Sequence, residues 1–468
     1  MAPVTGAIRH SLNALTPNDI QQPNKGNKMT TMAHPQKVGK SRKRSRITPG
    51  LVALAAVMLA GCSSSAGSTA VHSAPGSPAT PTPATAAPAA PAAAHGVEAP
   101  IGDVPWSKVG PGWMLALWNP VTPHMPGAQP IPDEPTPDVA ATTLYLLDPA
   151  GNRYPVTTFA PDDKAEPELI DWSGDGSHAL LEPDGYGSSS VVSIDLHTGA
   201  QTTIPIKGYA RYTGPDGKAL LVSTDYNGDE PGTLERIDLT GAEQKSYPTD
   251  QLGGAGQFSG RYLQSPDGTQ LVLGTANLGS EVVPRSDNSL VVMSDDGEIL
   301  RTLQSPMPKA QCSPVRWWTS TVLLTNCEGE LGSQLWEVPL DGGTPTALTA
   351  VNSGLEDDPG FGGDIGDTVA WQLPSGTFLQ STGACGTIFL SRLTPDMHTM
   401  RVKVPGVSDS VAVAGVTGDK LLLLAKVGCG GTTSLLTYDP AANTSTVLLG
   451  PPVNGGGVTD ALLYRGEK

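Results

Sequence analysis

The sequence predicts an all-β protein, a β-propeller of about seven four-stranded blades, because two kinds of turn recur along it and helical periodicity is almost absent. Short runs of β-branched and aromatic residues alternate with turns rich in Gly, Asp, Asn and Pro. In the first kind of turn, an apolar strand ends on an aspartate, and these aspartates recur every 43 to 57 residues. They are Asp148, Asp195, Asp238, Asp295, Asp341, Asp396 and Asp439.

The second kind of turn contains Asp-Gly and is followed at once by an apolar strand. It occurs in three segments, Trp172–Leu181, Thr213–Leu221 and Gln264–Leu273. Aspartate caps such a turn and glycine adopts the positive φ that it requires. Each repeat therefore predicts four strands, with the second kind of turn joining strands A and B and the first kind joining C and D. Seven marker turns predict seven blades, although six or eight remain open.

These turn-and-strand units resemble the repeats of the TolB propeller and of the propeller in dipeptidyl-peptidase-type enzymes. The resemblance covers roughly Ile101 to Leu449 and is weakest in the last three blades. It implies a fold and no function. The hydrolase domain of that peptidase family has no counterpart here, because no Gly-x-Ser-x-Gly segment opens a helix.

The N-terminal region has the three parts of a secretory signal. The basic stretch Lys37–Arg46 precedes ten apolar residues, Leu51–Ala60, and then Gly61 and Cys62. Ten residues form a helix of about 15 Å, too short for a bilayer core of about 30 Å. We therefore expect a signal peptide over residues 1–61. Residues 1–28 are polar and aperiodic, which favours a start at Met29 or Met32 and makes 1–28 a mis-assigned extension.

The four residues that end at Cys62 resemble a bacterial lipobox. The resemblance implies that a diacylglycerol group is attached to the Cys62 thiol and that the chain is cleaved before Cys62. Acyl chains such as palmitate would then hold the protein on the extracytoplasmic face of the cell membrane. The alternative is an ordinary signal peptide with an incidental cysteine.

Composition divides the rest of the chain into a linker and a body. Residues 62–96 are almost entirely Ala, Pro, Ser, Thr and Gly after Cys62, which predicts a disordered, stiff tether. Residues 97–468 form the predicted propeller. Residues 1–62 hold nine of the 29 basic and one of the 45 acidic residues, so the mature chain has 20 bases, 44 acids and a formal charge of −24. Such a body repels nucleic acid and anionic lipid surfaces.

Four further cysteines in an exported domain predict two disulfides. Cys312 would begin strand A of the fifth blade and Cys327 would end strand B, which brings them together. Cys385 and Cys429 fall in B–C loops of adjacent blades. We therefore expect Cys312–Cys327 and Cys385–Cys429. A metal site would need closer spacing such as C-x₂-C, and none is found among these cysteines.

Catalytic chemistry is sparse in the sequence. Three histidines, His178, His197 and His398, fall in A–B or C–D turns, away from the funnel where propeller ligands bind, and His124 lies in a Pro-rich loop. The best positive feature is a set of polar residues expected on or near strand A, which could hold a carboxylate in the funnel or form ion pairs between blades. The set is Asp171, Arg211, Asp225, Arg261 and Arg316.

Two weaker features complete the candidates. Asp225, Asn227 and Asp229 are spaced like the start of a calcium loop, but Glu230 replaces the glycine expected at position six. A polar hairpin tip is the alternative, and we expect no other cofactor and no metal. The pair Trp317-Trp318 suits blade packing better than a sugar platform.

The sequence thus predicts a cell-envelope lipoprotein whose propeller is a non-enzymatic binding or scaffold module for a protein, peptide or glycan. The alternative is an envelope hydrolase or lyase that uses carboxylates and arginine. A buried Glu or Asp beside Arg211 and Arg261 would favour the enzyme. One further expectation concerns closure of the ring. The apolar segment Val458–Tyr464 is a surplus strand, left over once the seventh blade has its four strands. It should pair with the first blade around Trp106–Trp118 and close the ring.

Overall fold

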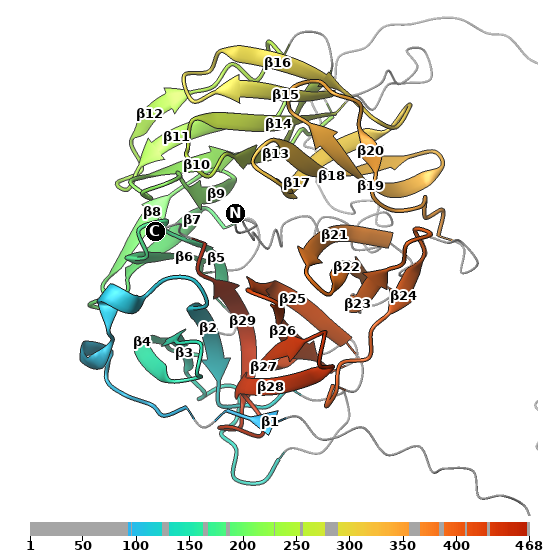
Figure 1. Cartoon of the computed structure of the whole chain (residues 1–468). Coiled ribbons are helices and arrows are strands. Elements are labelled where there is room, and N and C mark those ends of the chain that lie inside the picture. Colours follow the sequence, from blue (N-terminus) through green and yellow to red (C-terminus); the bar gives the residue numbers. More distant parts are fainter. Residues whose placement is uncertain are drawn as a thin grey trace, which may run out of the picture. The chain divides into compact units, whose positions relative to one another are not determined.

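A computed structural model describes the chain from residue 92 to 465, apart from residues 95, 124–130, 162–166, 184–187, 229, 253–255, 277–288, 355–365, 383–387, 408–409 and 428–430. The described residues form seven sheets, which are the blades of a β-propeller (Figure 1). Each blade has four strands, and the last carries a short fifth strand on its outer edge. The predicted all-β, seven-bladed fold is confirmed.

In every blade strand A lies nearest the centre of the ring and strand D lies at the outer edge (Figure 1). Blade 1 takes its strand A from the C-terminal end of the chain. Blade 1 consists of β29 (Gly457–Leu463), β2 (Met114–Asn119), β3 (Thr142–Leu147) and β4 (Arg153–Phe159). Blade 2 consists of β5 (Glu168–Trp172), β6 (His178–Glu182), β7 (Ser190–Asp195) and β8 (Gln201–Pro205). Blade 3 consists of β9 (Tyr209–Tyr212), β10 (Ala219–Ser223), β11 (Leu234–Asp238) and β12 (Glu243–Ser246).

The remaining blades follow in chain order, and two short 3-10 helices, η2 (Ile101–Asp103) and η3 (Trp106–Lys108), precede β2. Blade 4 consists of β13 (Gln257–Gln264), β14 (Gln270–Ala276), β15 (Ser289–Ser294) and β16 (Ile299–Gln304), and blade 5 of β17 (Gln311–Trp317), β18 (Val322–Gly329), β19 (Gly332–Pro339) and β20 (Thr346–Ala347). Blade 6 consists of β21 (Gly366–Leu373), β22 (Gly376–Thr382), β23 (Ile388–Leu393) and β24 (Thr399–Arg401). Blade 7 consists of β25 (Ser410–Thr417), β26 (Lys420–Lys426), β27 (Thr432–Asp439) and β28 (Thr444–Leu449). No helix among the described residues is long and apolar enough to span a membrane.

The turns work as the sequence predicts, and the turn between β13 and β14 shows how. Asp267 Oδ1 accepts hydrogen bonds from the backbone N–H of Thr269 (3.1 Å) and from the hydroxyl of Ser265 (2.5 Å). Gly268 has a φ of 74°, a conformation that glycine adopts without steric cost. Asp-Gly turns therefore fix the A–B connection and the register of the two strands that follow.

Apolar side chains fill the space between neighbouring blades, which is where the core lies. Strand residues alternate between the two blade faces, so each blade contributes to two interfaces. In β6, for example, Ala179 and Leu181 pack toward blade 1 while Leu180 packs toward blade 3. Separate apolar clusters fill the other interfaces between neighbouring blades in the same way.

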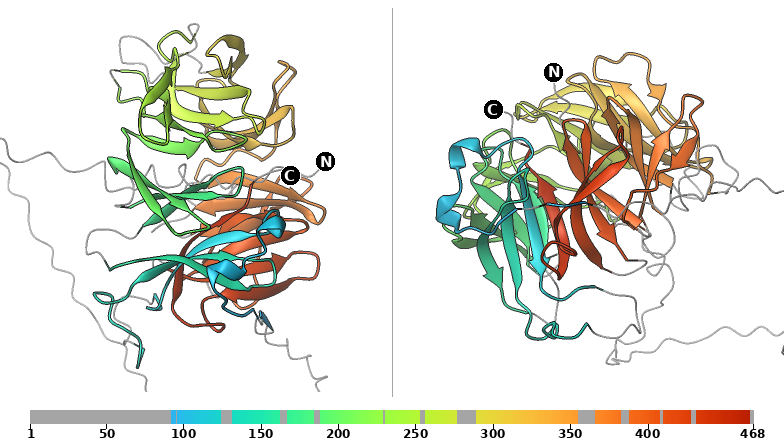
Figure 2. Two further views of the ribbon diagram at one scale, coloured as in Figure 1. Left: turned by 90° about the vertical axis from the view of Figure 1, so that its left-hand side faces the viewer. Right: turned by 60° about the horizontal axis from the view of Figure 1, so that its bottom comes forward.

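The ring is closed by the C-terminal strand, as the sequence predicts. β29 pairs antiparallel with β2, with Leu462 opposite Leu115 and Ala461 opposite Ala116. In the views of Figures 1 and 2, the dark red β29 lies beside the cyan β2. The N-terminal side adds a second contact that we did not expect: β1 (Ala92–Ala93) pairs in parallel with the outer edge of β28. Among the described residues, strand pairing thus starts at Ala92.

Candidate functional site

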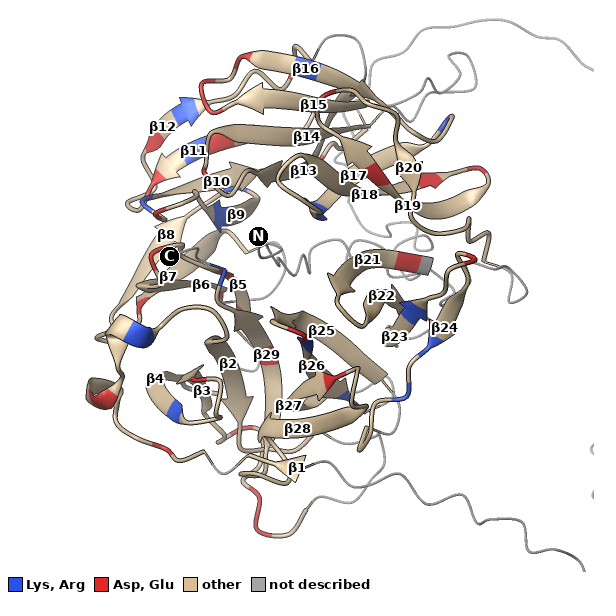
Figure 3. Ribbon diagram, viewed as in Figure 1, with Lys and Arg blue, Asp and Glu red and all other residues tan. Residues whose placement is uncertain are grey.

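The inner edges of the seven A strands face the centre of the ring, and we call this surface the inner wall. An innermost strand has no further strand to pair with, so side chains, a ligand or water must satisfy its backbone groups. Figure 3 shows charge on these strands, with a positive residue on β9 and a negative one on β21. These residues are Arg211 and Asp367. Four of the five charged residues predicted from the sequence, Asp171, Arg211, Arg261 and Arg316, belong to these innermost strands.

Asp171 and Arg211 lie together where blades 2 and 3 meet. Asp171 is 5% exposed, and its Oδ2 accepts a hydrogen bond from the backbone N–H of Tyr212 (2.9 Å). Arg211 Nη1 donates to the backbone carbonyl of Ile170 at 3.4 Å. Each side chain thus bonds to the backbone of the neighbouring A strand. The hydrogen bonds of these two side chains therefore connect blades 2 and 3.

Arg465 joins this pair and was missed by the sequence analysis. It follows β29, and its Nη1 lies 3.5 Å from Asp171 Oδ1. Burial lowers the pKa of the Arg465 guanidinium; Asp171 opposes that shift and Arg211 adds to it. The signal available in the sequence was that the surplus strand had to be an A strand, which places the residue after it at the inner wall.

Arg316 is the most deeply buried of the predicted arginines. It is 5% exposed, donates from Nη1 to the carbonyl of Ala370 in blade 6 at 3.0 Å, and lies over the ring of Trp371. Burial, followed by repulsion from Arg465, lowers its pKa to about 10. Arg316 therefore connects blades 5 and 6, while its charge acts on the group around Asp171.

Asp225 and Arg261 belong to a separate place on the ring. Asp225 is exposed in the B–C loop of blade 3. It lies so close to Gly260 that a Cβ there would come within 2.4 Å of Asp225 Oδ1, and Gly260 precedes Arg261 in a bulge of β13. Four of the five predicted residues thus form two neighbourhoods, Asp171 with Arg211 and Asp225 beside Arg261, while Arg316 lies apart between blades 5 and 6. Within the calcium-like loop, Asn227 Oδ1 accepts the N–H of Glu230 (2.8 Å), and Asp229 lies outside the described residues.

A buried carboxyl group, Glu182, was also missed. It ends β6, pairs across strands with Glu168 and is 1% exposed. Neither of its oxygens has a hydrogen-bond partner among the described residues. Burial raises the pKa of Glu182 to about 7; repulsion from Glu168 adds to the shift and Arg211 opposes it. A group that titrates near neutral pH can accept or donate a proton under physiological conditions.

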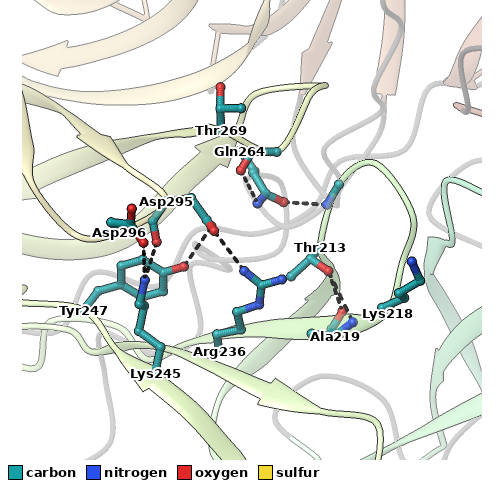
Figure 4. Close-up of polar contacts among 12 residues, drawn as sticks. Thr213, Lys218, Ala219, Arg236, Lys245, Tyr247, Gln264, Thr269, Asp295 and Asp296 are labelled. Atoms are coloured by element: carbon teal, nitrogen blue, oxygen red, sulfur yellow. Dashed lines mark hydrogen bonds and ion pairs between the residues drawn. The ribbon is translucent and has the colours of Figure 1, made fainter.

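Charged side chains also connect blades 3 and 4 farther from the centre (Figure 4). Arg236 Nη1 and the Tyr247 hydroxyl donate to opposite oxygens of Asp295, at 2.9 and 3.2 Å. Lys245 Nζ donates to the Asp295 carbonyl at 2.8 Å and to Asp296 Oδ1 at 3.3 Å. We call Arg236, Lys245, Tyr247 and Asp295 the blade 3–4 clasp. All its members make bonds within the protein, which favours a structural role.

Three histidines lie where the sequence placed them. His178 begins β6 after an A–B turn, whereas His197 and His398 lie in C–D turns. His197 stacks on Trp106 with ring centroids 3.7 Å apart, and His398 Nδ1 lies 2.6 Å from Asp396. His124 lies outside the described residues. The described residues contain no group of three or more His, Cys, Asp and Glu that could hold a metal ion.

The predicted Cys312–Cys327 disulfide is present and joins directly opposed residues of β17 and β18. Both cysteines are fully buried beside Met307 and Ala310. Cys385 and Cys429 lie outside the described residues, as does Cys62, so the second disulfide and the lipid attachment stay predictions. Trp317 packs between blades 4 and 5 and donates to the Gln264 carbonyl (2.9 Å), the packing role expected for it.

No protein-family model matches the chain, and no curated protein is similar to it in sequence. Similar solved structures include the propeller domain of the trilobed protease of Pyrococcus furiosus, 12% identical over 71% of this chain and 94% of that one, with a TM-score of 0.41. A protein from Agrobacterium tumefaciens described as TolB is 12% identical over 76% and 97% (TM-score 0.35). An oligogalacturonate lyase of Vibrio parahaemolyticus is 14% identical over 74% and 87% (TM-score 0.42).

The chain spans about half the length of several complete peptidases that it also matches, between 48% and 53%. At these identities and TM-scores the likenesses carry no argument about activity. The seven-bladed architecture follows from the strand pairing of this chain itself.

Proposed function

We propose that this chain is a lipid-anchored protein of the cell envelope whose propeller binds a protein, peptide or glycan without transforming it. The observation that supports the binding role is how the charged side chains are arranged on the inner wall. Asp171 and Arg316 are buried and hydrogen-bonded to neighbouring blades, so they hold the ring together. Arg211 and Arg465 are half-buried and present fixed guanidinium groups. Fixed groups of this kind suit recognition.

The anchor rests on the sequence between Lys37 and Cys62 and on the linker that follows. Substitution of Cys62 by Ser tests it directly, since serine offers no thiol for the lipid. We expect the variant to lack lipid in metabolic labelling and to leave the membrane fraction, or to stay as an uncleaved precursor. A variant that fractionates and labels like the wild type would refute the anchor.

The binding role is tested by using the lipidated protein as bait in detergent-solubilised membranes. A specific partner should be retained by the wild type and by an Arg401→Met variant, because Arg401 lies on an outer strand over Phe389. Retention should fall for Arg211→Met, which removes a guanidinium group from the inner wall. If all three proteins retain the same material in equal amounts, the inner wall is not the binding surface.

A hydrolase or lyase is the second candidate, and Glu182 is the observation that favours it. A buried carboxyl group with a pKa near 7 in the electric field of Arg211 suits general acid–base catalysis. An enzyme of this kind should lose activity on envelope glycans or peptides at least about 100-fold in Glu182→Gln. Glu243→Gln, on the exposed strand β12, is the matched control. Equal activity of the two variants would rule out this role for Glu182.

A further inference from the structure

Two side chains of opposite charge lie where blades 2 and 3 meet, and each has hydrogen-bonding capacity left over. Glu182 is buried, and neither of its oxygens has a partner among the described residues. Arg211 makes one hydrogen bond within the same part of the chain, to the Ile170 carbonyl at 3.4 Å. That bond is longer than the roughly 3.2 Å at which ordinary N–H···O bonds end, and a guanidinium group offers five donors.

Strand pairing places the two groups near each other. Leu180, two residues before Glu182 on β6, packs toward blade 3, and residues two apart on a strand share a face. Glu182 therefore also faces blade 3, from which Arg211 reaches Ile170. Ile170 is two positions from Glu168, the residue directly opposite Glu182. The Ile170 carbonyl and the Glu182 carboxyl group are thus separated by about 7 Å along the strand direction.

Two charged groups act on the Glu182 carboxyl group. Glu168 on β5 repels its negative charge and Arg211 on β9 attracts it, while burial has the largest effect. Together they raise the pKa of Glu182 to about 7. The nearby part of β7, Ser190–Val192, and the whole of β10 carry no charged residue. Asp184 lies outside the described residues.

Arg211 also faces the charged groups of the inner wall, and these have other partners. Asp171 and Asp460 each accept a backbone N–H of the next A strand at 2.9 Å, and Asp171 lies beside Arg465 as well. Neither carboxylate is hydrogen-bonded to Arg211 within the described part of the chain. Movement of the Arg211 guanidinium group toward Glu182 would therefore break only its long bond to the Ile170 carbonyl.

We propose that Glu182 and Arg211 form a pH-sensitive switch between blades 2 and 3. While Glu182 is protonated, Arg211 stays at the Ile170 carbonyl, the position seen in the structure. When Glu182 releases its proton to solvent, a buried carboxylate remains beside Glu168 without a partner, which is strongly unfavourable. The carboxylate then draws the guanidinium group, which keeps its own proton, away from Ile170 and into an ion pair.

The switch would withdraw a guanidinium group from the inner wall as the pH rises through about 7. The movement itself is a property of the folded chain and needs no ligand. Its effect on a partner rests on the proposed binding function, since Arg211 belongs to the surface that we propose for recognition.

Arginine side-chain NMR of the full mature chain follows the movement directly. The Nε–H signal of Arg211, assigned by its absence in Arg211→Lys, should shift between pH 6 and pH 8 with a midpoint near 7. In Glu182→Gln it should keep its pH 6 position throughout. Arg401, which lies over Phe389 on an outer strand, is the control and should not respond. An Arg211 signal that ignores pH, or a shift that persists in Glu182→Gln, would overturn the switch.

Urea unfolding of Glu182→Gln, Arg211→Met and the double variant measures the coupling between the two groups. At pH 8.5, Glu182→Gln should stabilise the Arg211→Met background more than the wild type, by at least threefold in the equilibrium constant of unfolding. The reason is that the ionised Glu182 loses its only attractive charge in Arg211→Met. At pH 5 the two effects should be equal. Equal effects at pH 8.5 as well would contradict the ion pair.

The membrane pull-down separates the switch from the proposed function. An Arg211-dependent partner should be retained less by the wild type at pH 8 than at pH 6, and equally at both by Glu182→Gln. If the NMR signal shifts as expected but no Arg211-dependent partner is retained, the switch stands and the proposed binding surface fails. If such a partner is retained but the NMR signal ignores pH, the binding surface stands and the switch fails.

Discussion

The seam between blades 7 and 1 and the interface between blades 3 and 4 are held together by different means. At the seam, backbone pairing joins the two ends of the propeller: β29, which continues the chain from blade 7, pairs with β2 inside blade 1, and β1 pairs with β28 of blade 7. Between blades 3 and 4 the chain is continuous, and side chains form the clasp around Asp295. A backbone ladder thus joins the two ends of the propeller inside blade 1, whereas side-chain contacts supplement the continuous chain between blades 3 and 4.

The seam is fastened at both its inner and its outer edge. At the inner edge, β29 supplies the whole strand A of blade 1. At the outer edge, the Ala94 N–H donates to the Val447 carbonyl (2.8 Å) in blade 7, and the Arg153 N–H donates to the Val97 carbonyl (3.0 Å) in blade 1. We call residues 92–94 and 96–99 the strap, because they lie along the outer strands of both blades.

Removal of the inner fastening should have the largest effect. Truncation after Gly450 deletes β29, leaves the inner edge of β2 unpaired and exposes apolar residues such as Leu115 and Leu117. We expect aggregation or rapid proteolysis, measured by size-exclusion chromatography and limited trypsin digestion. A truncated protein that melts cooperatively at the wild-type temperature would show that β29 does not close the ring.

The clasp should matter less, because covalent continuity and apolar packing remain. Asp295→Asn weakens two hydrogen bonds to charged or phenolic groups, at a cost of about 2 kcal/mol in the free energy of unfolding. Urea unfolding measures this change. Asp296→Asn is the control, since the Asp296 side chain is 96% exposed and its bond to Lys245 is worth little. Equal losses for the two variants would mean that the clasp does not stabilise the interface.

The contrast between these regions also shows what the sequence could reveal. The turns around Asp267 and the surplus apolar strand Val458–Tyr464 are local patterns, so the blades and the closing strand were predictable. The strap was not, because alanine-rich residues 92–94 carry no strand signal and their partner β28 lies some 350 positions away. Arg465 and Asp171 are separated by 294 positions, and no local pattern links them. Asp295 was recognisable as a turn marker, but its partners in blade 3 were not.

A change of pH should separate side-chain contacts from backbone pairing, because ionisable side chains titrate and paired backbone groups do not. The pKa of Glu182, between blades 2 and 3, is raised from an ordinary 4.5 to about 7 by burial. A raised pKa means that the folded protein holds the proton more tightly than the unfolded chain. This stabilisation is complete below about pH 4.5 and is lost as the pH rises through 7.

Glutamine resembles the protonated form at every pH, so Glu182→Gln should gain stability relative to the wild type as the pH rises. We expect the difference in the free energy of unfolding to grow by about 1–2 kcal/mol between pH 5 and pH 8. Urea unfolding at both pH values measures it, with exposed Glu243→Gln as the pH-independent control. A constant difference for Glu182→Gln would show that this carboxyl group titrates normally.

The strap should give the smallest effect, because its hydrogen bonds are offset by the entropy lost in ordering its residues. Deletion of residues 63–91 keeps the strap and should leave the melting temperature unchanged. Deletion of residues 63–99 also removes the backbone bonds to Val447 and Arg153, and should lower the free energy of unfolding by about 1 kcal/mol.

Glu98→Gln separates the side-chain part of the strap from its backbone part. The Glu98 side chain is half-exposed, and its Oε2 lies 3.0 Å from Arg153 Nε. Loss of this ion pair should therefore lower the free energy of unfolding by less than about 1 kcal/mol. The decisive comparison is between the two deletions: equal stability would mean that the outer edge of the seam needs no fastening and that β29 alone closes the ring. A larger loss for the longer deletion would mean that the segment joining the propeller to its predicted lipid anchor also holds blades 7 and 1 together.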